Sequence, residues 1–365
     1  MTGSDDSLIA DLRTYEVTSR VSRPVADATH EISRIAFLVL EVQTRGGAVG
    51  QGYMLSFDYS PEAIKGALRD LQAFVAQRSY HVYDTLSVSR DYEAASEYFG
   101  VEGLQRWALA TLDVAMWDAW ARTLGQPVWK LFGSHGDPIP VYGSGGWLSY
   151  SDDELLDEVS GYQRRGFGAI KVKVGSRETG RDLERLRMVR DAVGPHMQIM
   201  MDANQGMTVA GAVELATAVR EIGIHWFEEP INHRDFDGYA TIRDKTQISI
   251  ATGEREYDVL ALRELIARRA IDLWQPDIIR IGGVGPWRAS AALAAAHHIP
   301  VLPHYYKDYD VPLLATIPNG YGAESFDWVD DLIDEPMLIE NGTASPRPGP
   351  GWGFSFRREL LNEIP

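Results

Sequence analysis

The chain has 365 residues, of which 45% are hydrophobic and 24% are charged, the balance of an ordinary soluble globular protein. Acidic residues outnumber basic residues by 52 to 35, and the net charge of −17 excludes bulk electrostatic binding to nucleic acid or to an anionic membrane. Because there is no cysteine, disulfides and thiolate chemistry are also excluded. The acidic N-terminus and the lack of a long apolar run predict a soluble, cytoplasmic protein.

The first third of the chain predicts an α+β capping domain over residues 1–137. Strand-like runs around glycine turns come first, and helical periodicity follows. Strands followed by a group of helices indicate an α+β unit. The expected strands are residues 12–18, 35–43 and 49–55, and the expected helices are residues 62–77 and 104–124.

From residue 138 short apolar runs alternate with amphipathic helices, which predicts an α/β fold: a modified (β/α) TIM-like barrel over residues 138–335. Eight runs at this regular spacing favour a closed barrel over an open sheet. The remaining residues, 336–365, are expected to return to the cap. The expected barrel strands are residues 141–146, 169–175, 198–204, 225–230, 249–254, 273–277, 300–304 and 322–326, with helices that include 152–165, 181–193, 209–221 and 259–267.

Three consecutive barrel runs end in a carboxylate, namely Asp202, Glu228 and Glu254. The carboxyl ends of barrel strands meet on one rim, and neighbouring strands lie about 4.8 Å apart, so the three side chains are close enough to surround one ion. A ligand set of oxygens only suits Mg²⁺, one per chain, with Mn²⁺ as the alternative. A single acid at a strand end is often solvated or caps a helix, but three in succession favour a metal site.

Lys171 and Lys173 lie two residues apart in one run and therefore face the same side, the interior of the barrel near its rim. Two partly desolvated ammonium groups close to a metal are expected to have depressed pKa values, which makes one of them a candidate general base. Surface lysines on an edge strand are the alternative, but a barrel has no edge strands.

The sixth and seventh runs end in Asp277 and His304, and the eighth contains Glu324. A carboxylate bonded to one imidazole nitrogen fixes the tautomer and leaves the other nitrogen for proton transfer, so Asp277 and His304 form a candidate dyad. Glu324, if protonated, can donate a hydrogen bond to an oxyanion, although a solvated loop acid is also plausible.

In these segments the chain resembles the enolase superfamily, specifically its mandelate racemase subgroup. The resemblance covers nearly the whole chain and is carried by Lys-Val-Lys at 171–173, Asp-Ala-Asn at 202–204, Glu-Glu-Pro at 228–230, Thr-Gly-Glu at 252–254, Gln-Pro-Asp at 275–277, Pro-His at 303–304 and Glu324.

This resemblance implies that Asp202, Glu228 and Glu254 bind Mg²⁺ and that Lys173 and His304 are acid/base catalysts on opposite faces of the substrate. It further implies that Lys171 lies close to the substrate carboxylate, that Asp277 orients His304, and that Glu324 bonds the intermediate. The implied reaction is abstraction of the proton next to a carboxylate through an enediolate. The partner is a small carboxylate, and the protein is expected to form a homo-oligomer, an octamer or a dimer.

Residues 143–147 and the turn at 202–204 look like those of acid-sugar dehydratases, with Ser144 and Asn204 as substrate contacts. Residues 19–30, with Arg20, Arg23 and His30, are expected to cover the site and select the substrate. Dehydration of an aldonate or aldarate to a 2-keto-3-deoxy acid is the preferred hypothesis for the reaction. Racemisation, epimerisation or cycloisomerisation uses the same residues and stays open.

Two other classes of function remain. A non-catalytic protein that binds a metal or a sugar acid is expected to lack at least one catalytic group, whereas Lys173, Asp277 and His304 are all present. A metal-dependent barrel hydrolase is expected to carry a His-x-His pair, which this sequence lacks.

Overall fold

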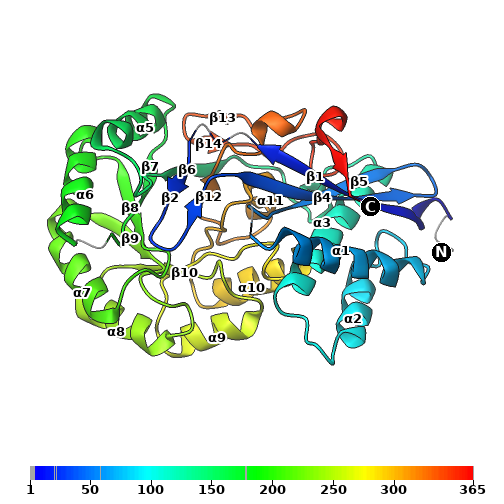
Figure 1. Cartoon of the computed structure of the whole chain (residues 1–365), viewed down its shortest axis with the longest axis horizontal. Helices are drawn as coiled ribbons and strands as arrows, with labels where there is room; N and C mark the ends of the chain where they lie inside the picture. Colours follow the sequence, from blue (N-terminus) through cyan, green and yellow to red (C-terminus); the bar gives the residue numbers. More distant parts are fainter. Residues whose placement is uncertain (1–4, 20, 22, 58, 177–178, 365) are drawn as a thin grey trace.

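The computed structural model describes residues 5–19, 21, 23–57, 59–176 and 179–364 and shows a cap and a barrel side by side (Figure 1). In the cap, the antiparallel sheet has the order β15-β1-β4-β5. Its strands are β1 (Ile9–Ser19), β4 (Ile35–Thr44), β5 (Val49–Leu55) and β15 (Asn362–Glu363). The helices beside it are α1 (Pro61–Ala76), α2 (Thr85–Ala95) and α3 (Leu104–Thr123), followed by the short α4 (Val128–Leu131).

Helix α3 packs closely on the cap sheet because two glycines in β5 leave room for it. A Cβ at Gly50 would lie 2.3 Å from the backbone of Ala115 and Ala119, and one at Gly52 would lie 2.3 Å from the carbonyl of Thr111. Nearly every residue of β4 is buried, since both faces of this central strand are covered. This packing explains why the expected strands at residues 35–43 and 49–55 were readable as apolar runs.

The second domain is a barrel-like parallel sheet surrounded by helices, so the predicted α/β fold with a capping domain is confirmed. The strands run in the order β11-β10-β9-β8-β7-β6, and β12 pairs in parallel with β6. They are β6 (Ile139–Gly145), β7 (Ala169–Lys173), β8 (Gln198–Asp202), β9 (Ile224–Glu228), β10 (Ile250–Thr252), β11 (Leu273–Trp274) and β12 (Ala323–Ser325). The helices are α5 (Asp152–Arg164), α6 (Thr179–Val193), α7 (Val209–Ala218), α8 (Phe236–Thr246), α9 (Val259–Ala267), α10 (Val284–Ala296) and α11 (Lys307–Leu314).

The sixth and seventh barrel strands are shorter than predicted. β11 ends at Trp274, and the seventh position is a single residue, Val301, which bridges Trp274 on one side and Gly320 on the other. Pro276 and Pro303 follow these positions, and a proline cannot donate a ladder hydrogen bond. The predicted strand ends at 277 and 304 therefore lie in loops that leave the barrel rim.

The sequence did not predict helix α2 or a hairpin of the cap. Within the segment 19–30 and just beyond it, β2 (Val25–Ala26) and β3 (Glu31–Ile32) form an antiparallel hairpin that extends from the cap to the barrel (Figure 1). We call residues 25–32 the cap hairpin. Arg20 lies outside the described residues.

The C-terminal segment contacts both domains. β13 (Ile339–Glu340) and β14 (Thr343–Ala344) form a hairpin whose second strand pairs with β6, whereas β15 pairs with β1 in the cap. The C-terminus accordingly lies beside the cap sheet in Figure 1. In the described part of the chain, no helix combines the length and the apolar character needed to cross a membrane.

One buried carboxylate ties α3, the cap sheet and the C-terminal segment together. The side chain of Asp118 is 1% exposed. It accepts hydrogen bonds from the amide of Gln51 (2.9 Å), the amide of Trp352 (2.8 Å) and Nε of Arg122 (2.8 Å). Removal of this carboxylate leaves two buried backbone amides without an acceptor and the half-buried guanidinium of Arg122 without its ion-pair partner.

We therefore expect Asp118→Ala to lower the free energy of unfolding by about 3–5 kcal/mol, the usual cost of breaking a buried ion pair. Urea unfolding at neutral pH measures the change. Asp70→Ala, which removes an exposed acid from α1, serves as the matched control and should change the free energy by less than about 0.5 kcal/mol. Equal effects of the two variants would contradict a linking role for Asp118.

Candidate active site

The register of the barrel strands places the central charged residues side by side. Lys173 in β7 is paired with Asp202 in β8, and Asp202 is paired with Glu228 in β9. Because strand side chains alternate, Lys171 projects on the same side as Lys173. All four side chains are buried, and Lys173, Asp202 and Glu228 are the last residues of their strands.

The two lysines are held by carboxylates. Lys173 Nζ lies 2.6 Å from Asp202 Oδ2. Lys171 Nζ forms an ion pair with Glu228, lies 2.6 Å from Glu324 Oε1 and lies 3.5 Å from Asp202 Oδ2. The structure thus brings together five of the residues singled out in the sequence.

The depressed lysine pKa values expected beside a metal are not produced by the protein side chains alone. Burial, and for Lys173 the neighbouring charge of Lys171, lower the lysine pKa as anticipated. The charges of Asp202 and Glu228 outweigh both effects, and the pKa values of Lys171 and Lys173 lie above the ordinary value. The prediction from the sequence included the like charge of the neighbouring lysine but not the carboxylates that contact the same two lysines.

Glu324 is an anion in this arrangement. Burial acts to raise its pKa, but the charges of Lys171 and His304 outweigh burial and hold the pKa below the ordinary value. Its Oε2 accepts a hydrogen bond of 2.9 Å from the amide of Tyr305. Glu324 can therefore donate to an oxyanion only after it takes up a proton, and Lys171 is the donor that is already in place.

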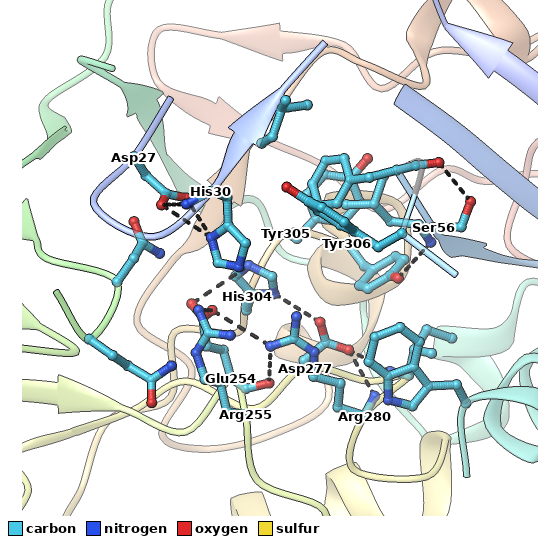
Figure 2. A pocket seen from close by; sticks show the side chains of 18 of the residues that line it. Asp27, His30, Ser56, Glu254, Arg255, Asp277, Arg280, His304, Tyr305 and Tyr306 are labelled. Carbon is cyan, nitrogen blue, oxygen red and sulfur yellow. Dashed lines mark hydrogen bonds and ion pairs between the residues drawn. The ribbon is translucent and has the colours of Figure 1, made fainter. Parts of the chain in front are cut away.

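His304 is held by carboxylates on both sides of its ring (Figure 2). Nδ1 lies 2.8 Å from Asp277 Oδ2, and Nε2 lies 3.6 Å from Glu254 Oε2. Asp277 is itself fixed, because its Oδ1 accepts from the amides of Ile279 (2.8 Å) and Arg280 (2.9 Å). The arrangement directs Nε2 away from Asp277, as the candidate dyad requires.

A cavity of about 650 Å³ lies between the cap and the barrel rim. Its wall includes Lys173 from β7, Glu254 from the loop after β10, and the pair Asp277 and His304. Figure 2 shows this pair with Glu254 below the cap hairpin. The two candidate acid/base groups, Lys173 and His304, therefore reach one cavity from widely separated parts of the barrel.

The four predicted substrate contacts have different positions. His30 and Asn204 line the cavity, and Asn204 Oδ1 is buried without a hydrogen-bond partner among the described residues. Ser144 is buried in β6 and is not among the described residues that line the cavity. Arg23 forms an ion pair with Glu154. Arg23 is not among the described residues that line the cavity, and a contact between Arg23 and the substrate stays a prediction.

Several residues of the site were not singled out in the sequence. Gln275 Nε2 donates to Glu228 Oε2 (2.7 Å), and Trp226 Nε1 lies 3.2 Å from the same oxygen. Arg255 Nε donates to Glu229 Oε2 (2.8 Å). Each of these residues lies next to a strand-end acid in the sequence or two residues before one. Amide, indole and guanidinium donors at such flanking positions are the signal by which the sequence could have shown them.

The acidic residues suit a divalent cation in chemistry and in charge. Asp202 and Glu228 offer oxygens and already face a cationic group, the ammonium of Lys171, which stands in for a metal ion. Burial raises the pKa of Glu228 to about 7 against the pull of Lys171, and the charges of Asp202 and Glu254 add to the rise. The three carboxylates Asp202, Glu228 and Glu324 contact the two ammonium groups of Lys171 and Lys173, so there is one more acidic group than basic group.

No ready-made metal cage of three acidic, histidine or cysteine side chains is found in the described part of the chain. The third predicted ligand has other partners in this structure. Glu254 faces Arg255 (3.5 Å), Arg280 (3.7 Å) and His304 instead of Asp202. Glu254 would have to exchange these partners for the ion.

Comparison with known proteins places these features in context. The chain is 29% identical over 346 residues to L-talarate/galactarate dehydratase of Salmonella typhimurium, which covers 93% of this chain and 86% of the relative. It is 28% identical over 349 residues to 3,6-anhydro-alpha-L-galactonate cycloisomerase of Streptomyces coelicolor, which covers 93% of this chain and 94% of the relative.

Solved structures agree with these relatives. A crystal structure of L-talarate/galactarate dehydratase with Mg and L-glucarate superposes with a TM-score of 0.92 at 26% identity, covering 99% of this chain and 94% of that one. A racemase from Streptomyces coelicolor with bound magnesium gives a TM-score of 0.91 at 27% identity, covering 97% of this chain and 100% of the other.

Each of the two domains also matches a known protein family. Residues 9–133 match the mandelate racemase/muconate lactonizing enzyme N-terminal domain. Residues 154–360 match the enolase C-terminal domain-like family. The chain therefore belongs to the mandelate racemase/muconate lactonizing subgroup of the enolase superfamily.

Proposed function

We propose that this protein is a Mg²⁺-dependent acid-sugar dehydratase that converts an aldonate or aldarate into a 2-keto-3-deoxy acid. The observation that carries the proposal is the placement of two acid/base groups, Lys173 and the His304–Asp277 pair, on the wall of one cavity beside a buried carboxylate cluster. The related dehydratases, one of which is crystallised with Mg and L-glucarate, support this choice.

The first task of the site is to bind the substrate carboxylate and to stabilise the charge that develops on it. Asp202, Glu228 and Glu254 would hold Mg²⁺, which would supply positive charge for the oxygens of the substrate carboxylate and, by weakening the ion pairs of the lysines, would lower their pKa values. Lys171, buried in the cluster, adds its positive charge beside the proposed ligands Asp202 and Glu228. One oxyanion donor contributes about 3–4 kcal/mol, so several are needed for a doubly charged enediolate.

Lys173 then removes the proton from the carbon next to the carboxylate. It is the lysine of the pair that lines the cavity, whereas Lys171 does not reach the described wall. Its ion pair with Asp202 fixes the position of Nζ. A positioned general base of this kind accelerates proton transfer by about 10²–10⁴-fold.

His304 completes the reaction by protonating the hydroxyl that leaves from the adjacent carbon. Asp277 holds Nδ1, so the proton that is transferred resides on Nε2. Loss of water from the enediolate gives an enol, which becomes the 2-keto-3-deoxy acid. The water that leaves consists of the substrate hydroxyl and the proton from Nε2 of His304. The proton held by Lys173 is released to solvent, and His304 takes up a proton from solvent, so the net loss is one water.

A second candidate reaction is cycloisomerisation or epimerisation. It is favoured by the similarity to 3,6-anhydro-alpha-L-galactonate cycloisomerase over 93% of this chain. In epimerisation His304 returns a proton to carbon, and no 2-keto-3-deoxy acid appears. In cycloisomerisation of a 3,6-anhydro acid the ring ether oxygen leaves in place of a hydroxyl, so the product is an isomer of the substrate and no water is lost.

The test is incubation of the purified protein and Mg²⁺ with individual aldonates and aldarates, followed by ¹H NMR of the mixture. A 2-keto-3-deoxy acid establishes the dehydratase. An epimer or a rearranged isomer without that product establishes the second candidate. If no acid sugar changes and none loses a proton at the carbon next to the carboxylate, the proposed function is wrong.

The metal gives a further expected result. Treatment with EDTA followed by desalting should reduce kcat by at least about 10³-fold, since the charge of the enediolate would lose its main partner. Added Mg²⁺ should restore the activity and Mn²⁺ should do so in part, because both prefer oxygen ligands, whereas Ca²⁺ should restore little. Full activity in the chelated protein would contradict a metal role for the carboxylate cluster.

A further inference from the structure

A carboxylate from the cap hairpin lies on the wall of the catalytic cavity. The side chain of Asp27 is only 6% exposed, and it lines the cavity (Figure 2). Its Oδ1 accepts from the amides of Thr29 and His30, both at 2.7 Å, and its Oδ2 lies 3.0 Å from His30 Nδ1. A carboxylate oxygen has room for two hydrogen bonds, so Oδ2 retains an acceptor position for a ligand.

The cap hairpin is fixed to the barrel rim, and Asp27 is fixed with it. The hydroxyl of Thr29 donates to the carbonyl of Asn204 (3.2 Å). Ala28 packs on Gly206, where a Cβ would lie 2.5 Å from the Ala28 Cβ. The absence of a side chain at that glycine lets the hairpin approach the rim this closely. Asp27 therefore has a fixed position on the wall of the cavity.

This carboxylate stays ionised. Burial acts to raise the pKa of Asp27, but the hydrogen bond from His30 and the charge of Lys173 outweigh burial and hold the pKa below the ordinary value. A substrate hydroxyl beside Asp27 can donate a hydrogen bond to it. A second substrate carboxylate in the same place meets a like charge in a partly desolvated cavity, which is costly.

Another part of the wall is aromatic. The ring of Trp328 lies 4.5 Å from that of Phe326, 5.9 Å from that of Trp147 and 5.9 Å from that of Phe57, measured between centroids. All four residues line the cavity. Such surfaces pack against the carbon–hydrogen faces of a sugar chain but give a carboxylate no positive charge.

Most cations of the cavity are already paired. Lys173, Arg255 and Arg280 each face a carboxylate of the protein. Among the described residues of the wall, Arg234 is the arginine without such an ion pair, and it is exposed. A dicarboxylate would have to be recognised through Arg234. Binding of a second substrate carboxylate by Arg234 is therefore the alternative that a test has to exclude.

We infer that this protein selects acid sugars with a single carboxylate (aldonates) over the matching dicarboxylates (aldarates), and that Asp27 sets this preference by accepting a hydrogen bond from a substrate hydroxyl. The inference rests on the proposed function for its substrate class, but it concerns a residue outside the proposed acid/base and metal groups.

The test compares pairs of acids that differ only at the far end of the chain, gluconate with glucarate and galactonate with galactarate. Calorimetric titration of the Mg²⁺-loaded protein gives the binding constants, and ¹H NMR of the same mixtures gives the turnover. We expect the better-bound aldonate to exceed its matched aldarate by at least about 100-fold in affinity or in kcat/KM.

Asp27→Asn keeps an acceptor oxygen for the amides of the hairpin and removes the charge, so it should narrow this ratio by at least about tenfold. Glu31→Gln removes an exposed charge from the same hairpin and should leave the ratio unchanged. If Asp27→Ala unfolds the hairpin, Asp27→Asn still separates charge from structure.

The inference is overturned if the wild type binds the aldarates as tightly as the aldonates, or if Asp27→Asn leaves the ratio unchanged. It is also overturned if Arg234→Ala, and not Asp27→Asn, changes the ratio. Selective binding of aldonates without any product or proton exchange would support the inference and refute the proposed reaction. If no acid of either kind binds, both are wrong.

Discussion

Replacement of Lys173 by alanine should abolish exchange of the substrate proton next to the carboxylate and reduce kcat by at least about 10³-fold. Lys173 is the buried lysine that reaches the cavity, and its Nζ is fixed 2.6 Å from Asp202. Arg255 and Arg280 cannot take the proton in its place, because guanidinium groups are not bases at neutral pH, and His304 is assigned to the opposite face of the substrate. Assays of product formation measure kcat, and ¹H NMR in D₂O measures the exchange of the proton.

The control for this variant is Lys245→Ala, which removes an exposed lysine from α8 and should leave kcat within about twofold of the wild-type value. Urea unfolding shows whether Lys173→Ala remains folded. A folded Lys173→Ala enzyme that still exchanges the proton at the wild-type rate would show that another group is the base.

Replacement of His304 by asparagine should separate the two halves of the reaction. We expect formation of the 2-keto-3-deoxy acid to fall by at least about 10³-fold, since the leaving hydroxyl loses its proton donor. Exchange at the Lys173 face should persist within about tenfold. Asp277→Asn should reduce product formation by about 10²–10⁴-fold, because an amide can hold the imidazole in the wrong tautomer.

The comparison of these variants is informative because His304 and Asp277 act as a unit. The double variant should lose little more activity than His304→Asn alone. If the losses from His304→Asn and Asp277→Asn multiply, or if His304→Asn stops proton exchange as completely as Lys173→Ala, the roles assigned to the two faces are wrong.

Much of the fold could be predicted from the sequence because the barrel repeats one pattern. Apolar runs such as Ala169–Lys173 and Gln198–Asp202 are short, bounded by turns and separated by amphipathic helices. The acids at the strand ends could also be recognised, because a charged residue at the end of a short apolar run is unusual. The pairing of Asp202 with Lys173 and Glu228 then follows from parallel register.

What could not be predicted depends on contacts between distant segments. The helix Thr85–Ala95 buries only Val88 and Tyr92, too few for a clear helical period. The cap hairpin has strands of two residues, and its position is set by packing on Gly206 and Asn204, far away in the sequence.

The same limit applies to electrostatics and to side-chain direction. The raised lysine pKa values depend on Glu228 and Glu324, which lie more than 50 residues away in the sequence. Arg23 was expected in the substrate site because of its segment, but its partner Glu154 in α5 could not be inferred from local pattern. Burial and pairing of charges become readable only when the strands are assembled.

The most direct measurement of the central claim is ¹H NMR of the proton on the carbon next to the carboxylate, for wild-type protein and Lys173→Ala with Mg²⁺ in D₂O. The account predicts that the wild type removes this proton from an acid sugar, with loss of its signal or formation of the 2-keto-3-deoxy acid, and that Lys173→Ala does neither. A product that retains this proton, or equal exchange by both proteins, would contradict it.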